Sequence, residues 1–96
     1  MAEHPQRLHA VIKGRVQGVG FRAFVLEQAL RLHLTGWVRN TWDGNVEVLA
    51  EGERADLDTL YALLDPGPRG SLVERITPEW LDGTGEFSIF RVERTA

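Results

Sequence analysis

Residues 8–33 of the chain read LHAVIKGRVQGVGFRAFVLEQALRLH, a segment that passes from strand to turn to helix. In residues 8–13, apolar side chains recur at every second position, and this period predicts a β-strand. Residues 14–20 then place three glycines in seven positions, which is typical of a tight turn. A helix is predicted from about residue 21 to residue 33, because apolar side chains fall on one arc at about 100° per residue.

Two more strands and a second helix are predicted on the carboxyl side of this segment. The strands cover residues 34–41 and 45–51, and an Asp-Gly pair at 43–44 favours a β-hairpin between them. The helix carries apolar side chains at the i, i+3, i+4 and i+7 positions and ends at a Pro-Gly-Pro sequence over 66–68. Its apolar residues are Leu57, Leu60, Tyr61 and Leu64.

The last part of the chain predicts strands over 72–80 and 86–93, with an extra strand or an irregular bend near Thr77-Pro78. The resulting order is βαββαβ. This order is typical of the α+β class with a ferredoxin-like sandwich, in which two helices pack on one face of an antiparallel sheet. Many unrelated functions use this fold, so function has to be argued from individual residues.

Composition limits the classes of protein to which the chain can belong. With 96 residues, 43% of them hydrophobic, we expect a single domain over 1–96, with residues 1–6 as a mobile tail. A net charge of −3 argues against nucleic-acid or membrane-surface binding, and the absence of cysteine excludes disulfides and thiolate metal sites. The first seven residues hold no apolar run, and no long apolar segment follows, so we expect a cytoplasmic protein. No exposed apolar stripe demands a partner, and we expect a monomer.

The glycine-rich loop and Arg22 together suggest an anion site. Backbone N–H groups of such a loop can point inward, and the start of the following helix adds partial positive charge. Arg22 lies within the apolar arc of that helix, and its charge opposes the helix dipole. A residue that breaks two local rules often marks a functional site. The alternative is that Arg22 extends past the helix end or pairs with a nearby carboxylate.

Asn40 is a second candidate, at the end of the strand over 34–41. It shares its parity with Gly36 and Val38, so it is expected to face the same side of the sheet. A carboxamide there can both donate to and accept from a water molecule. From spacing alone, the more common role of asparagine before a turn is to satisfy local backbone groups.

Two segments carry a resemblance to a known family. Residues 12–22, IKGRVQGVGFR, look like the first signature of the acylphosphatase family. Residues 36–46, GWVRNTWDGNV, with Gly52 six residues further on, look like the second. The similarity covers nearly the whole chain, although the last strand departs from the pattern around Phe90. The resemblance implies the βαββαβ fold and hydrolysis of acyl phosphates to a carboxylate and inorganic phosphate.

The resemblance also implies roles for particular residues. Arg22 would hold the phosphoryl group and Asn40 would orient the attacking water. The group would be surrounded by backbone N–H groups of the loop, namely those of Arg15, Val16, Gln17, Gly18, Val19 and Gly20. Neither signature offers a side chain suited to covalent catalysis, so we expect direct in-line attack by water, with its proton passing to the substrate. The expected partner is a small acyl phosphate, and we expect no cofactor and no metal. The three histidines, His4, His9 and His33, lack metal-ligand spacing.

Other interpretations remain open from the sequence. The same loop and arginine would suit a non-catalytic module that binds a small anion, and only Asn40 favours turnover. RNA binding on the sheet is opposed by the acidic balance and by the lack of the aromatic and basic pattern that it needs. Handling of carbamoyl phosphate, as in related domains of larger maturation proteins, is a narrower variant. Trp42, at the hairpin tip, is a candidate for contact with the acyl part of a substrate.

Overall fold

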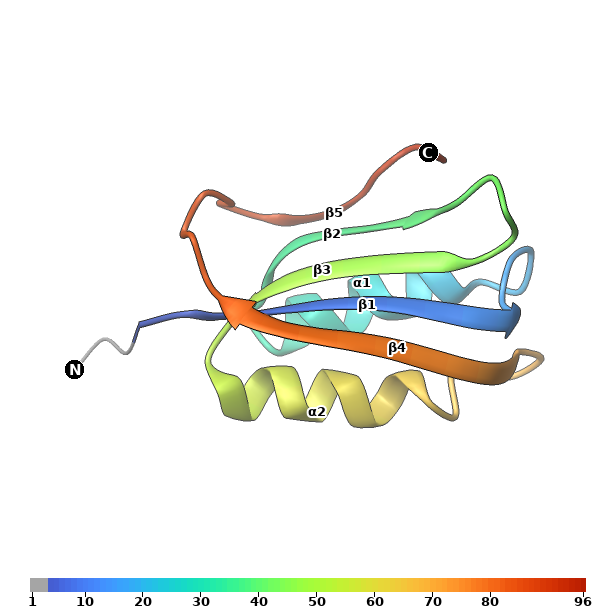
Figure 1. Cartoon of the computed structure of the whole chain (residues 1–96), viewed down its shortest axis with the longest axis horizontal. Coiled ribbons are helices and arrows are strands. Elements are labelled where there is room, and N and C mark those ends of the chain that lie inside the picture. Colours follow the sequence, from blue (N-terminus) through green and yellow to red (C-terminus); the bar gives the residue numbers. More distant parts are fainter. Residues whose placement is uncertain (1–3) are drawn as a thin grey trace.

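The computed structural model describes residues 4–96 as one sheet covered by two helices (Figure 1). In chain order the elements are β1 (Gln6–Arg15), α1 (Phe21–Arg31), β2 (Thr35–Asn40), β3 (Val46–Gly52), α2 (Arg54–Leu64), β4 (Leu72–Asp82) and β5 (Phe90–Val92). The five strands lie in the order β4-β1-β3-β2-β5. No helix within these residues is long and apolar enough to cross a membrane.

The core lies on one face of the sheet, because alternate side chains of the central strands point to opposite faces. Leu8, Ala10 and Ile12 of β1 are fully buried, and so are three residues of β3 at the same parity. They form a single cluster with the buried residues of both helices, so α1 and α2 cover the same face (Figure 1). The predicted α+β, ferredoxin-like architecture is confirmed.

Two details of the sheet differ from the prediction. The sheet is mixed, because the short strand β5 runs parallel to β2, with Val38 beside Val92. In place of an extra strand or bend near Thr77-Pro78, β4 continues through Pro78. Proline is tolerated there because β4 is an edge strand, where one row of N–H groups has no partner in the sheet.

The amino-terminal end also enters the sheet earlier than expected. A tail was expected over residues 1–6, but Gln6 already pairs with Gly52 on one side and Asp82 on the other. The carbonyl of Pro5 accepts a hydrogen bond from the amide of Gly83 at 2.8 Å. Residues 1–3 of the expected tail lie outside the described residues.

Candidate active site

Topology brings the glycine-rich loop and Asn40 to the same end of the sheet. Strands β1 and β2 both pair antiparallel with β3, so they run parallel to each other and their carboxyl ends lie at the same end of the sheet. The loop over 16–20 leaves the end of β1 at Arg15, and Asn40 is the last residue of β2. Although one strand separates β1 from β2, their carboxyl ends therefore face a common region.

The loop owes its shape to glycine and to one buried anchor. Gly18 and Gly20 have φ angles of 75° and 80°, a left-handed conformation that side chains other than glycine rarely adopt. Val16, which lies between the end of β1 and these two glycines, is 1% exposed and attaches the loop to the core. Helix α1 begins directly after Gly20, with no side-chain cap and no acidic residue in its first turn. The free N–H groups of that turn are therefore available to an anion.

The side chain of Gln17 ties this loop to the hairpin between β2 and β3. Its Nε2 donates to the carbonyl oxygens of Thr41 and Asn45, each at 2.8 Å. Both bonds are partly buried, and they join segments 24 and 28 residues apart in the chain. The loop that precedes Arg22 is thereby held against the turn that follows Asn40.

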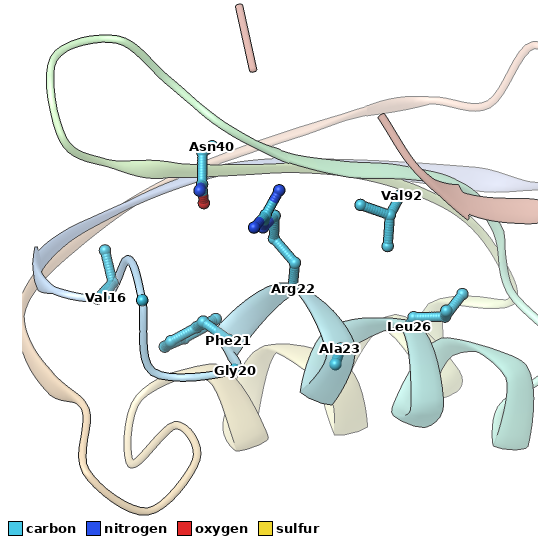
Figure 2. Close-up of a pocket in the computed structure, with 9 residues that line it drawn as sticks. Val16, Gly20, Phe21, Arg22, Ala23, Leu26, Asn40 and Val92 are labelled. Atoms are coloured by element: carbon cyan, nitrogen blue, oxygen red, sulfur yellow. The ribbon is translucent and has the colours of Figure 1, made fainter. Parts of the chain in front are cut away.

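A pocket of about 330 Å³ lies between α1 and the sheet, and Arg22 and Asn40 both line it (Figure 2). The side chain of Arg22 extends from the first turn of α1 toward the sheet, and the carboxamide of Asn40 extends from the sheet toward α1. Within residues 4–96, no carboxylate forms an ion pair with Arg22. The alternative in which Arg22 pairs with a nearby acidic residue is therefore wrong for the described chain.

Asn40 faces the helices, as its shared parity with Val38 predicts, and it lines the pocket. Its Oδ1 atom is buried and accepts no hydrogen bond from any described residue. Its backbone is fixed on both sides, by pairing with Val46 of β3 and by the amide of Ala96, which donates to the Asn40 carbonyl at 3.1 Å. A strand fixed on both sides thus presents this acceptor to the pocket.

The structure brings together some of the predicted site residues and separates others. Among the predicted residues, those that line the pocket are Val16, Gly18, Gly20, Arg22 and Asn40. Arg15, Gln17 and Val19, whose backbone N–H groups were also predicted to surround the phosphoryl group, do not line the pocket, although Gln17 has the bridging role described above. Sequence reasoning did not assign four apolar lining residues to the site, namely Phe21, Ala23, Leu26 and Val92.

Trp42 lies outside this pocket. Its side chain is 83% exposed, and it lines a separate hollow together with Thr41 and Asp43. The pocket that holds Arg22 therefore has no contact with Trp42 in this structure.

The histidine at position 9 belongs to the opposite face of the sheet. His9 Nε2 lies 2.6 Å from Glu47 Oε2, and Arg39 Nε donates to the other oxygen of Glu47 at 2.8 Å. Burial alone would raise the pKa of Glu47, but these two hydrogen bonds lower it below its ordinary value. In residues 4–96, no group of three or more His, Cys, Asp or Glu side chains is placed to hold a metal ion.

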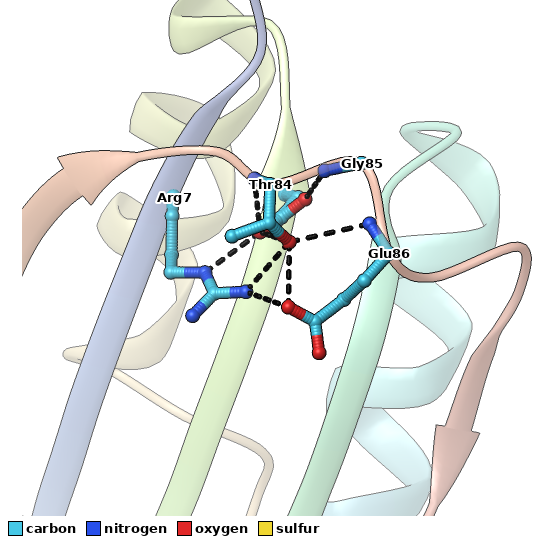
Figure 3. A network of polar contacts seen from close by, with 5 residues as sticks. Arg7, Thr84, Gly85 and Glu86 are labelled. Carbon is cyan, nitrogen blue, oxygen red and sulfur yellow. Dashed lines mark hydrogen bonds and ion pairs between the residues drawn. The ribbon is translucent and has the colours of Figure 1, made fainter.

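A buried carboxylate, that of Glu51, fixes the segment between β4 and β5 through a network of polar contacts (Figure 3). Glu51 is 2% exposed, and its oxygens accept from the amides of Thr84 and Gly85, each at 2.9 Å, and from Arg7 Nε at 2.7 Å. Burial would raise the pKa of Glu51, yet these donors together hold it below its ordinary value. The network pins the segment from β4 to β5, and β5 then pairs with β2.

The fold and the pocket define a small α+β protein whose pocket holds an arginine and an asparagine at one end of the sheet. A sequence model of the acylphosphatase family matches residues 8–92. An acylphosphatase of Salinibacter ruber is 47% identical over 89 residues, which cover 93% of this chain and 94% of that protein. The chain therefore belongs to the acylphosphatase family, as its two signatures predict.

Solved structures agree with this assignment. The crystal structure of an acylphosphatase from Bacillus subtilis superimposes with a TM-score of 0.88 at 35% identity, covering 92% of this chain and 98% of that one. The same fold occurs within full-length HypF, solved in a phosphate- and nucleotide-bound form, with a TM-score of 0.89 at 27% identity. That match covers 99% of this chain but 13% of HypF.

Replacing Gln17 by methionine tests the tie between loop and hairpin. Methionine keeps the length of the side chain and removes both donors, so the loop opens more often. We expect hydrogen exchange to quicken by about tenfold at the amides of Phe24 and Thr41, which donate to the carbonyls of Gly20 and Asn45 on the two sides of the tie. The matched control is Gln28→Met, on the far side of α1. Unchanged exchange in the Gln17 variant would contradict the tie.

Replacing Glu51 by glutamine tests the buried network. We expect the free energy of unfolding at pH 7 to fall by about 1.5–3 kcal/mol, because charge-assisted hydrogen bonds are lost. The pKa of Glu51 in the folded chain lies below its ordinary value of 4.5. The stabilisation that ionised Glu51 gives the folded chain is therefore complete above pH 4.5, and it is lost as the pH falls through the lowered pKa of the folded state. Urea denaturation of both proteins at several pH values is expected to give curves that converge in acid.

The exposed Glu86 provides the control for Glu51. It accepts from Arg7 in the same network but is largely solvated, so Glu86→Gln is expected to change stability much less. Equal losses in the two variants would mean that burial of Glu51 does not determine the strength of the network.

Proposed function

We propose that the pocket lined by Arg22 and Asn40 is the site at which this member of the acylphosphatase family hydrolyses acyl phosphates to a carboxylate and inorganic phosphate. Arg22 and the backbone N–H groups of residues 15–20 bind the phosphoryl oxygens, and Asn40 directs water at phosphorus. Identity of 47% to an acylphosphatase over nearly the full length of both chains supports the activity.

One observation carries the assignment of roles. A guanidinium with no described acidic partner and a buried carboxamide oxygen with no described donor line one small pocket. The planar guanidinium suits two oxygens of a phosphoryl group, as charge-assisted bonds to phosphate require. The carboxamide oxygen cannot accept from an anion that has no hydrogen, but it can accept from water. The pair thus supplies one group for the phosphate and one for the nucleophile.

Water is the nucleophile in this proposal. The lining residues of the described pocket offer no Ser, Thr, His, Asp or Glu side chain to form a phosphoryl-enzyme or to act as base. A carboxylate is a good leaving group, so the reaction needs positioning and charge stabilisation more than acid help. The proton of the water passes to a phosphoryl oxygen of the substrate. Rapid-quench trapping tests this step, because a stable phosphoryl-enzyme would refute it.

The reaction is proposed to need no metal, since the lining side chains present no carboxylate or imidazole. We further propose that the protein works as a monomer, because one chain supplies both Arg22 and Asn40 to the pocket, and that it is cytoplasmic. The deciding assay measures phosphate release from acetyl, benzoyl and carbamoyl phosphate with EDTA present. Binding of phosphate without turnover of any of the three would favour the non-catalytic module instead, and that module is disfavoured by Asn40.

Replacing Arg22 by alanine tests the phosphoryl contact. We expect kcat/KM to fall by at least about 10²–10³, the usual loss for one preorganised donor. Arg22→Lys is expected to lose nearly as much kcat/KM, because a point charge cannot replace two parallel N–H hydrogen bonds. Arg31→Ala, at the exposed end of the same helix, is the control. Full activity in Arg22→Lys would mean that charge alone suffices.

Replacing Asn40 by alanine separates positioning of water from binding of phosphate. We expect kcat to fall by about 10²–10³, while inhibition by inorganic phosphate stays nearly unchanged, because Arg22 and the loop remain. Steady-state kinetics with acetyl phosphate and with phosphate as inhibitor give both quantities. If phosphate binding weakens as much as turnover slows, Asn40 acts on the phosphoryl group and the assigned role is wrong.

A further inference from the structure

Arg22 lies between two parts of the pocket (Figure 2). We call the part with Asn40 and the glycine-rich loop the polar half, although Val16 and Phe21 also line it, and the other part the apolar half. On one side of the guanidinium lie Asn40 and the loop at Val16 and Gly20. On the other side lie Leu26, one turn further along α1, and Val92 of β5. The phosphoryl group and its water need only the polar half. The apolar half therefore has no part in the function described so far.

We propose that Ala23, Leu26 and Val92 form an acyl-binding shelf that receives the organic part of the substrate. The shelf favours acyl groups that carry a short alkyl chain or a single ring over the smaller acetyl group. This inference rests on the proposed function, because it uses the direction of attack assigned to Asn40.

The direction of the reaction places the acyl group on this shelf. In an in-line displacement, the attacking and leaving oxygens lie on opposite sides of phosphorus. Asn40 holds the water on its own side of Arg22, so the leaving carboxylate lies on the other side. That side is the one occupied by Leu26 and Val92 (Figure 2).

The exposure of Val92 agrees with a surface that a ligand covers. Phe90 and Val92 have the same parity in β5 and pair with Gly36 and Val38 of β2, whose inner face covers the core. Phe90 is 4% exposed, whereas Val92 is 42% exposed and lines the pocket. On α1, Ala23 and Leu26 are three residues apart and so lie on neighbouring turns of one face. An apolar acyl group would bury these side chains.

Volume limits the size of the acyl group. A pocket of about 330 Å³ is at the small end of ligand sites, and the phosphoryl group fills part of it. The remainder suits a short alkyl chain or a single ring. Among described residues, Arg22 is the one charged side chain in the lining, so the shelf itself offers no partner for a polar acyl group.

Acetyl and butanoyl phosphate test the shelf, because their carboxylic acids have nearly equal acidity and differ by two methylene groups. We expect wild type to show a kcat/KM about tenfold higher for butanoyl phosphate, since each buried methylene favours binding. Val92→Thr keeps the shape of the side chain and adds a hydroxyl, and Leu26→Ala removes apolar surface. Both variants are expected to lose most of the preference, because kcat/KM falls further for butanoyl phosphate than for acetyl phosphate.

Matched controls lie just outside the pocket. Ile89→Thr, in the exposed segment before β5, and Leu30→Ala, on the exposed side of α1, are expected to keep the preference. Equal kcat/KM values for both substrates in wild type, or an undiminished preference in folded Val92→Thr and Leu26→Ala, would overturn the shelf while leaving the proposed function intact. Hydrolysis of neither substrate would overturn both.

Discussion

Two hydrogen bonds from the side-chain amide of Gln17 hold the two parts of the candidate site together. They connect the loop after β1 to the turn after β2, two segments that share no strand pairing. Arg22 follows this loop and Asn40 precedes this turn, so the position of the cation relative to the carboxamide depends on the same contact. Each bond is individually modest, and the two act together with the buried Val16 to hold the loop. The site is thus a product of tertiary contact as much as of the glycine pattern.

The rest of the fold supplies a rigid frame for that contact. Parallel alignment of β1 and β2 through β3 brings their carboxyl ends to one end of the sheet. At the other end of the sheet, Glu51 secures the segment before β5, which brings Val92 over the pocket. Catalysis of this kind depends on positioning, and the charged and polar groups here stand on a helix and a strand fixed by the core. The network far from the pocket therefore contributes to the shape of the apolar half.

The sequence alone predicted those features that follow from local pattern. The position of Arg22 within an apolar arc and the parity of Asn40 with Val38 were both readable, and the family signatures placed them in one site. The contacts of Gln17 were not predictable, because its partners are backbone carbonyls that carry no residue-specific signal. Val92 was missed although a strand over 86–93 was predicted, because nothing in the sequence shows that this strand pairs parallel with β2 and so reaches the pocket.

The most direct measurement of the central claim is a titration of the protein with inorganic phosphate, followed by ¹⁵N NMR. If one phosphoryl group binds between the cation and the carboxamide, the largest shifts will occur at the amides of residues 16–22, at Arg22 Nε–H and at the side-chain amide of Asn40. Saturation of phosphate binding with these signals unmoved, and with shifts elsewhere on the molecule, would contradict the account.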